Sequence, residues 1–342
     1  MTNSFSVLLI SLIFLFILNY FFKKKKFLID KISIKEKHKK LLSLDNNVPL
    51  SGSFYFFPFI FFLFYQTNNL FIIICGLFFC LGLLSDLKIT DSPKIRLLIQ
   101  SILLFFFIFI SKDIEIDTRI KFLNNLMNFE FFRVFIISFF FLVLINGFNF
   151  IDGVNNLCSL NFLIILIFIF LISRELNNFY NEKVSFLLIL SVTVFVLFNF
   201  FGKNFLGDGG VYGFSFLIGF IIIQVSFFDE KISPYFLANL LWYPAFENLF
   251  SIIRRSLDKK KNYVADNYHL HQLIFKYFQN KKIFKRKYLI SSLAGITINC
   301  YLALFYYFGY IDYSDTKRQV YIIILNIIVY LYVYSKLKKL ND

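Results

Sequence analysis

The chain has 342 residues, of which 58% are hydrophobic, 22% aromatic and only 17% charged, and its mean hydropathy is +0.69. A soluble domain needs more polar surface to face water, so this composition excludes an ordinary soluble enzyme or binding module. The formal net charge of +15 does not indicate a nucleic-acid partner. The charges gather in short loops beside apolar segments, as expected for topology signals and for contacts with anionic lipid headgroups.

Apolar runs long enough to cross a bilayer recur along the whole length. They predict an all-α, polytopic integral membrane protein with a single domain over residues 1–342. The four cysteines lack CxxC spacing and are interpreted as small core residues, not as a disulfide or zinc framework. About eleven transmembrane helices are expected, at residues 5–22, 52–66, 69–85, 94–111, 131–150, 158–172, 184–200, 211–228, 234–252, 288–309 and 319–335.

The loop charges predict the orientation of the chain in the membrane. An odd number of spans places the two termini on opposite sides. If the N-terminus lies outside, the inner loops hold 27 of the 36 Lys and Arg residues. The positive-inside rule therefore predicts an N-out, C-in arrangement.

Four polar stretches interrupt the apolar sequence at span ends, and all four fall on the predicted cytoplasmic side. They are GLLSDLKITDSPKIRLL (82–98), NGFNFIDGVNNL (146–157), FNFFGKNFLGDGGVYG (198–213) and ADNYHLHQLIF (265–275). The FLGDGG stretch alone is also compatible with a tight turn between two helices. A solvated turn has no reason to prefer one side, however, and an acid without a partner at the bilayer edge is disfavoured. The one-sided cluster therefore indicates a functional site.

The residue types in these stretches indicate the chemistry. Carboxylates and amides can hold Mg²⁺ through oxygen atoms, with a polyphosphate as the other ligand, and basic or imidazole groups can bind the remaining phosphate oxygens. Asp86 and Asp152 are also compatible with ordinary helix-end acids. His269 and His271 provide too few ligands for a zinc site, and Glu247, within a predicted span, needs a partner. A site at this face would take a nucleotide-activated donor and a lipid acceptor.

The motifs resemble, in order, those of the polyprenyl-phosphate N-acetylhexosamine-1-phosphate transferases, the family 4 glycosyltransferases that include MraY, WecA and TagO. GLLSDL is similar to G-x-x-D-D-x, NGFNFIDGVNNL to N-x-x-N-x-x-D-G-x-D-G-L, FLGDGG to F-x-G-D-x-G, and HLHQL to the histidine motif of the last large inner loop. KHKKLLSLDNNVPLSGS (37–53) resembles the first inner loop. The resemblance covers roughly residues 30–280. It is nearer to WecA than to MraY, because the histidine-rich loop is reduced.

The resemblance implies an enzyme that transfers a sugar 1-phosphate from a UDP-N-acetylhexosamine to undecaprenyl phosphate and releases UMP. It implies Mg²⁺ as cofactor, the bacterial inner membrane as location, a site facing the cytoplasm and a role in starting a surface glycan such as an O-antigen of lipopolysaccharide. It leaves a homodimer open. The implied metal ligands are Asp208 and Asp152. The implied catalytic residues are Asp86, Asp152, His269 and His271. The implied substrate-binding residues are Phe205, against the uracil ring, and Asn149, Asn155, Asn199, Lys88 and Gly153.

The sequence departs from the family pattern at three positions. Ser85 replaces the first acid of the pair, Asn155 replaces the second Asp of the D-G-x-D-G motif, and Asn156 stands where Gly is usual. An amide both donates and accepts, so Asn155 can still pair with uracil. A lipid phosphate is largely dianionic at pH 7, because its second pKa is near ~6. It scarcely needs a base, and the loss of one carboxylate is expected to slow the reaction without abolishing it.

Two other functions are compatible with these features. The first is a transporter or flippase for a lipid-linked sugar. Transporters tend to carry midplane polar residues on broken helices and paired repeats, whereas here the acids lie at span ends on one face and no repeat is seen. The second is a catalytically degenerate homologue, given Ser85 and Asn155.

Overall fold

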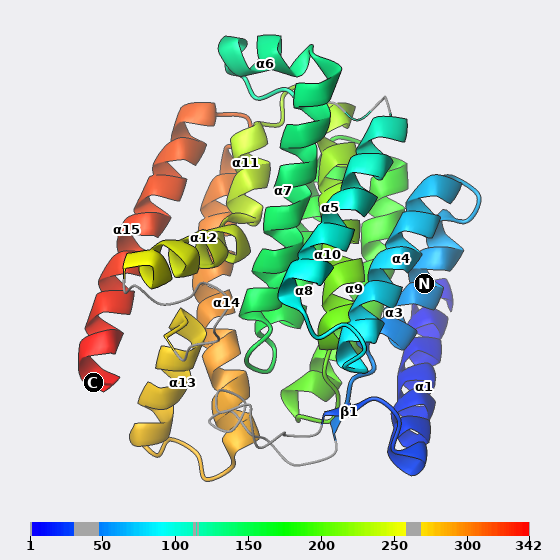
Figure 1. Ribbon diagram of the computed structural model, residues 1–342, viewed down its shortest axis with the longest axis vertical. Coiled ribbons are helices and arrows are strands. Elements are labelled where there is room, and N and C mark those ends of the chain that lie inside the picture. The colour runs from blue at the N-terminus through cyan, green and yellow to red at the C-terminus, as the bar shows by residue number, and fades with distance from the viewer. Residues whose placement is uncertain (1, 31–47, 112–113, 115, 258–267, 342) are drawn as a thin grey trace.

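The computed structural model describes residues 2–30, 48–111, 114, 116–257 and 268–341, and it is built almost entirely of helices (Figure 1). A two-residue antiparallel pair, β1 (Ile29–Asp30) with β2 (Val48–Pro49), is the sheet among these residues. The helices are α1 (Thr2–Lys25), α3 (Gly52–Phe64), α4 (Asn69–Asp86), α5 (Pro93–Ile110), α6 (Lys121–Met127), α7 (Glu130–Ile151), α8 (Leu157–Glu175), α9 (Phe179–Phe200), α10 (Gly207–Phe228), α11 (Pro234–Leu240), α12 (Trp242–Leu257), α13 (Leu270–Asn280), α14 (Lys287–Ile311) and α15 (Thr316–Asn341).

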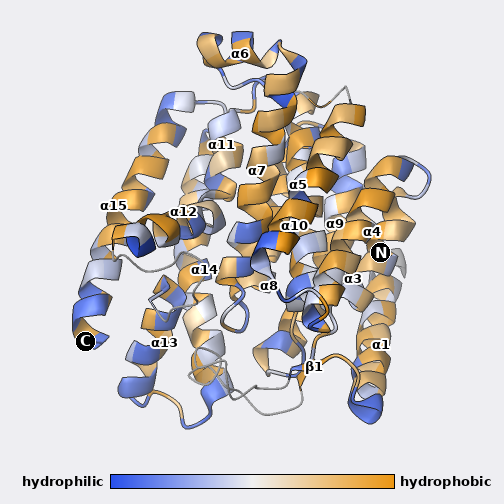
Figure 2. Ribbon diagram, in the orientation of Figure 1, coloured by the Kyte–Doolittle hydropathy of each residue, from blue (hydrophilic) through white to orange (hydrophobic). Residues whose placement is uncertain are grey.

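The predicted all-α, polytopic membrane fold is confirmed. Within the described ranges, nine helices are long and apolar enough to cross a membrane, and α3 is a shorter apolar helix of 13 residues. The hydropathy colouring in Figure 2 shows apolar residues along these helices and polar residues gathered towards their ends. Two of the four cysteines, Cys80 and Cys300, are exposed and not part of the core as predicted, whereas Cys75 and Cys158 are buried.

The span expected at residues 234–252 is instead two helices, α11 and α12, with a break at Leu241. Pro244 supplies the physical reason. It has no N–H to donate, and its ring would clash with the carbonyl four residues earlier in a straight helix, so it favours a break or kink at this point. Figure 1 shows α12 lying across the direction of the long helices, beside α15.

Local sequence signals explain where several helices begin. The Asn68 side chain accepts a hydrogen bond from Phe71 N (2.9 Å) at the start of α4, and Asn178 does the same for Asn181 N (3.0 Å) at the start of α9. Pro93 and Pro234 occupy the first positions of α5 and α11, where a missing N–H costs nothing.

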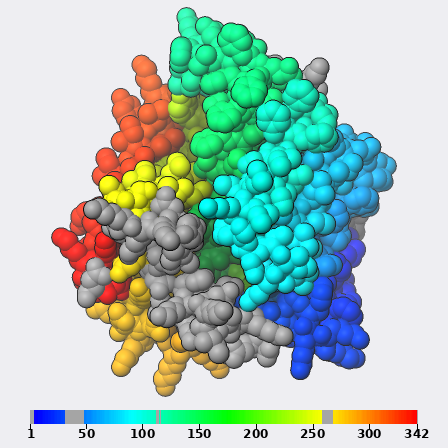
Figure 3. Space-filling view, viewed as in Figure 1, coloured from blue at the N-terminus to red at the C-terminus, as the bar shows by residue number. Residues whose placement is uncertain are grey.

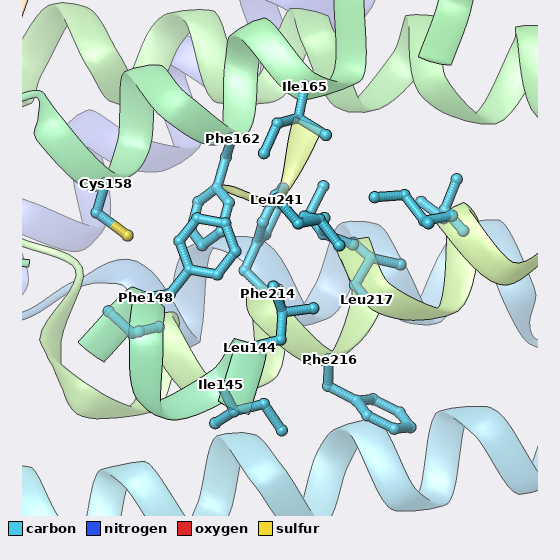
Figure 4. Packing of buried hydrophobic residues seen from close by; sticks show 14 of the residues in the cluster. Leu144, Ile145, Phe148, Cys158, Phe162, Ile165, Phe214, Phe216, Leu217 and Leu241 are labelled. Atoms are coloured by element: carbon cyan, nitrogen blue, oxygen red, sulfur yellow. The ribbon is translucent and has the colours of Figure 1, made fainter. Parts of the chain in front are cut away.

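Helix α10 forms the centre of the bundle and packs against α3, α4, α7 and α8. Its most apolar 18-residue window is 78% buried, the highest share among the nine candidate spans of the described residues. Figure 4 shows aromatic rings from three helices meeting in this core. The ring centroids of Phe148 and Phe162 are 4.4 Å apart, and those of Phe162 and Phe214 are 4.7 Å apart.

The long helices alternate in direction. The ends of α4, α7 and α9 and the starts of α5, α8 and α10 therefore lie at one end of the bundle, lower in Figure 1. The polar stretches at these helix ends, which were predicted to lie at one face, therefore lie at the same end of the bundle.

Glycines allow α4 and α10 to approach closely at this end. A Cβ atom added at Gly82 on α4 would overlap the backbone of Asp208 and Gly209 at the start of α10. Because the obstacle is backbone and not a flexible side chain, only glycine fits this contact without moving a helix.

Replacing Gly82 with Ala is expected to destabilise the protein by about 1–3 kcal/mol, since overpacking forces backbone shifts. Gly76→Ala is the matched control on the same helix, because its Cβ would lie 3.3 Å from Phe57 ring carbons, which can yield. Thermal unfolding of both variants in detergent tests this difference. Equal melting midpoints for the two variants would contradict the tight contact.

Candidate active site

The end of α4 is joined to the start of α10 by the carboxylate of Asp86. Its Oδ1 accepts a hydrogen bond from Asp208 N (2.9 Å), and its Oδ2 accepts one from Gly209 N (3.2 Å). Helix N-termini present N–H groups without intrahelical partners and carry a partial positive charge, so a carboxylate is well placed there. Asp86 therefore caps α10, and in this geometry its role is to hold the start of that helix.

The loop before α10 needs Gly207. This residue has a φ of +70°, and an added Cβ would lie 2.6 Å from Asp86 Oδ2. Glycine adopts this conformation without steric cost and leaves room for the capping carboxylate. The F-x-G-D motif thus gives the turn that brings Asp208 to the first turn of α10.

The side chain of Asp208 is held by two neighbours. Its Oδ2 accepts hydrogen bonds from Arg96 Nη1 (2.7 Å) on α5 and from Ser85 Oγ (2.5 Å) on α4, and Arg96 Nη1 also donates to Ser85 Oγ. The side chains of Arg96 and Asp208 are 19% and 30% exposed, so the pair opens to solvent. Charge-assisted hydrogen bonds of this kind fix the orientation of a carboxylate.

Phe205, which precedes Gly207 in the same loop, is fixed by hydrogen bonds of its backbone. Its N–H donates to Pro49 O (2.9 Å), and its carbonyl accepts from Ser51 N (3.1 Å), which forms a short parallel bridge between Leu50 and Phe205. The ring is half-buried. These two hydrogen bonds to residues 49 and 51 therefore fix the backbone of Phe205, three residues before Asp208.

Asn156 explains one departure from the family pattern. Its φ is +61°, in the left-handed region where glycine is favoured and Asn is tolerated. Asn156 N donates to Asn199 Oδ1 (2.6 Å), and Asn199 Nδ2 donates to Asn204 O (2.7 Å). The amide of Asn199 thus ties residues 151–157 to the loop that carries Phe205.

Gly153 and Asn155 face different neighbours. A Cβ at Gly153 would overlap Nε2 of His271, so the imidazole lies directly against the Gly153 backbone. Asn155 is buried, and its backbone N–H donates to Ser291 Oγ (2.9 Å) on α14. Its side-chain nitrogen Nδ2 is buried without a hydrogen-bond partner among the residues that the structure describes, which leaves a donor for a ligand that enters beside this loop.

The two histidines stack on one another at the start of α13. Their ring centroids are 5.5 Å apart with an interplanar angle of 13°, and His269 Nδ1 lies 2.9 Å from Glu247 Oε1 on α12. Burial, followed by the nearby charge of His269, lowers the pKa of His271 to about 3, although Glu247 opposes the shift. His271 is therefore neutral at physiological pH.

Acidification is expected to destabilise the protein through His271. The folded state keeps this imidazole neutral down to about pH 3, whereas the unfolded chain protonates it below pH ~6.5. The destabilisation is absent above pH ~6.5, grows as the pH falls towards 3, and reaches about 2 kcal/mol at pH 5. Melting midpoints at pH 7.5 and pH 5, compared between wild type and His271→Gln, measure this term. An equal drop in both proteins would contradict it.

The remaining predicted residues lie at the same end of the bundle. Asn149 and Asp152 are half-buried at the end of α7, and Lys88 is exposed in the turn after α4. Within the described ranges, no three His, Cys, Asp or Glu side chains are grouped closely enough to hold a metal ion. Residues 37–47 of the first-loop motif and 265–267 of the histidine stretch lie outside the described residues.

Figure 3 shows a hollow on this face between the cyan surface around α5 and the yellow surface of α12, with green helices at its floor. Arg96, which reaches Asp208 from 112 residues away, was not predicted as a site residue. Its signal in the sequence is its place in the polar stretch 82–98. Tyr330, which contacts Glu247, was missed because it lies within an apolar span.

In comparison with known proteins, one family model matches a part of the chain. Residues 68–226 match the model of glycosyl transferase family 4, a segment that runs from the start of α4 almost to the end of α10. It contains Asp86, Asp152, Phe205 and Asp208, and it ends before the two histidines. Among curated proteins no match is found. The family match supports transfer of a phosphosugar to a polyprenyl phosphate by this membrane protein.

Proposed function

We propose that the protein transfers an N-acetylhexosamine 1-phosphate from a UDP-sugar to undecaprenyl phosphate and releases UMP. In this reaction a lipid phosphate oxygen attacks the phosphorus attached to the sugar, and the pyrophosphate P–O bond to UMP breaks. The product would start a surface glycan such as an O-antigen, in the manner of WecA. The location would be the bacterial inner membrane, with the site facing the cytoplasm.

One observation carries this proposal: the carboxylate of Asp208 is presented at the N-terminus of α10, where Ser85 and Arg96 donate to it and Asp86 accepts from the backbone N–H of the same residue. Anionic phosphates bind favourably at helix N-termini and beside guanidinium groups. Phosphoryl transfer depends mainly on alignment and on neutralising charge, so the loss of the first acid of the pair at Ser85 does not remove the means of catalysis.

The residues present fit Mg²⁺ bound jointly by protein and donor. Mg²⁺ commonly uses one or two carboxylates together with substrate phosphates and water. Both carboxylate oxygens of Asp86 accept hydrogen bonds from backbone N–H groups. In Asp208, the hydrogen bonds from Arg96 and Ser85 both reach Oδ2 and not Oδ1. Asp208 is therefore the proposed ligand, with Asp152 as a second candidate. When bound, the ion would supply charge neutralisation on the pyrophosphate.

The other proposed roles follow from position. Phe205 would stack on the uracil ring, and Asn155 would pair with uracil through its buried amide. Asn149, Gly153 and Lys88 would line the donor site. Asn199 would act by fixing the loops that carry Asn155 and Phe205, since its amide is engaged by both. His269 and His271 would face the phosphates of the donor.

The proposal predicts that Phe205→Ala raises the KM for the UDP-sugar roughly 10-fold and leaves the KM for the lipid unchanged. Base–aromatic stacking is worth roughly 1–3 kcal/mol in nucleic-acid complexes. Phe201→Ala is the matched control, because Phe201 lies four residues earlier and its side chain is 51% exposed. An unchanged donor KM in Phe205→Ala would remove Phe205 from the uracil site.

A transport assay separates the proposed enzyme from a transporter. Purified protein in liposomes with UDP-N-acetylglucosamine, Mg²⁺ and undecaprenyl phosphate should form a lipid-linked sugar pyrophosphate that mass spectrometry detects. A transporter would instead move a preformed lipid-linked sugar across the bilayer without forming new product. Absence of product with every UDP-N-acetylhexosamine tested would contradict the proposed activity.

A further inference from the structure

The carboxylate of Glu247 lies deep in the protein and is satisfied from two other helices. It is 1% exposed on α12. Its Oε1 accepts from Leu270 N (3.4 Å) and lies 2.9 Å from His269 Nδ1, while its Oε2 accepts from Tyr330 OH (2.6 Å) on α15. Burying a carboxylate costs free energy unless the group is paired and hydrogen-bonded, as Glu247 is here. Such an arrangement suggests a role for Glu247 beyond packing.

The contact with Glu247 determines how the His269 imidazole is used. A carboxylate accepts hydrogen bonds, so the Nδ1 atom beside it carries the proton in both the neutral and the charged ring. The other ring nitrogen, Nε2, lies on the opposite edge and faces away from Glu247. In functional histidines, a carboxylate partner of this kind fixes both tautomer and ring orientation.

Two further rings restrict the plane of His269. The ring centroid of Phe150, near the end of α7, lies 5.6 Å from that of His269, and the ring of His271 stacks on it at 5.5 Å. Phe150 precedes Asp152 by two residues, and His271 contacts the Gly153 backbone. The imidazole is therefore held beside the loop that carries Asp152.

We propose that Glu247 and Tyr330 are positioning residues that orient His269, with Tyr330 holding the carboxylate and the carboxylate holding the imidazole. The inference rests on the proposed function, in which His269 contacts the donor's phosphates. Glu247, His269 and Tyr330 all lie outside the segment that matches the glycosyl transferase family. This chain thus uses its C-terminal helices to complete a site that begins in the matched segment.

The kinetic test is a double-mutant cycle. Glu247→Gln is expected to lower kcat about 10- to 100-fold, as is typical for the outer partner of a functional histidine, and to leave the KM for lipid unchanged. Tyr330→Phe should cause a smaller loss in the same direction. Adding Glu247→Gln to His269→Gln should cost nothing further, because Glu247 acts through His269. Additive losses would overturn the proposal.

Tyr243→Phe is the matched control. Tyr243 lies one turn before Glu247 on α12 and is fully buried, and its hydroxyl has no hydrogen-bond partner in the described part of the chain. Its ring centroid is 6.5 Å from that of Tyr330, so it belongs to the same aromatic cluster. Activity in this variant should match wild type. A loss equal to that of Tyr330→Phe would indicate general disturbance of the cluster and would contradict a positioning role.

A spectroscopic test does not depend on activity. The chain has three histidines, so NMR of isotope-labelled histidine gives few signals, and His269→Gln assigns the one of interest. The His269 ring should show a protonated Nδ1 in wild type, and Glu247→Gln should change its nitrogen shifts. If no transfer activity exists in any protein but this shift occurs, the proposed function fails and the positioning stands. An unchanged His269 spectrum in Glu247→Gln overturns the positioning itself.

Discussion

Replacing Asp208 with Asn is expected to lower the rate of UMP release about 100-fold or more. The substitution keeps the shape of the side chain but removes the charge that would hold Mg²⁺ against the donor's pyrophosphate. Losing a metal-bound carboxylate costs several kcal/mol of transition-state stabilisation, which corresponds to this rate change. Excess Mg²⁺ should restore part of the rate, because a weakened site fills at higher concentration.

Asp91→Asn is the control for this experiment. Asp91 is an exposed carboxylate in the turn between α4 and α5, at the same end of the bundle. Its removal changes the local charge equally and should leave the rate unchanged. Near-normal UMP release from Asp208→Asn would mean that the glycines of FLGDGG only bend the chain and that the metal lies elsewhere.

Replacing Arg96 with Leu is expected to lower the rate about 100-fold, as when one preorganised electrostatic donor is removed from an active site. Arg96 Nη1 donates to both Asp208 Oδ2 and Ser85 Oγ, so this single atom orients the carboxylate and supplies positive charge next to the phosphate site.

Arg96→Lys separates charge from packing. Only one guanidinium nitrogen makes the two contacts, and a lysine ammonium has three donors that can replace it. We therefore expect Arg96→Lys to retain most of the rate, measured as UMP release alongside the melting midpoint. Equal losses in the Leu and Lys variants, with unchanged midpoints, would contradict this and show that a positive charge alone at residue 96 is not sufficient.

The long apolar spans were predictable because hydrophobic length alone specifies them. Helix starts at Asn68, Pro93 and Ser233 also carry local signals that the structure uses. The break between α11 and α12 was present in the sequence as Pro244, but a count of apolar residues over 234–252 concealed it. The charged residues Arg254 and Arg255 at the end of α12, both buried, belong to a helix that lies across the bundle.

The site was predictable only as far as local motifs extend. Asp86, Asp208 and the histidines stand in recognisable stretches, and the structure joins Asp86 to Asp208 directly. The residues that orient these side chains do not stand in recognisable stretches. Arg96 lies 112 residues from Asp208, and Tyr330 lies 83 residues from Glu247. Contacts of that separation depend on how helices pack. Asn156 was interpreted as a departure from the family pattern, yet its left-handed conformation explains why Asn can replace Gly there.

The most direct measurement of the central claim is UMP release by the purified wild-type protein from UDP-N-acetylhexosamines. A phosphoglycosyl transferase should release UMP only when undecaprenyl phosphate and Mg²⁺ are both present, with one lipid-linked sugar pyrophosphate formed for each UMP. Release that is independent of the lipid phosphate, or no release with any of these donors, would contradict the claim.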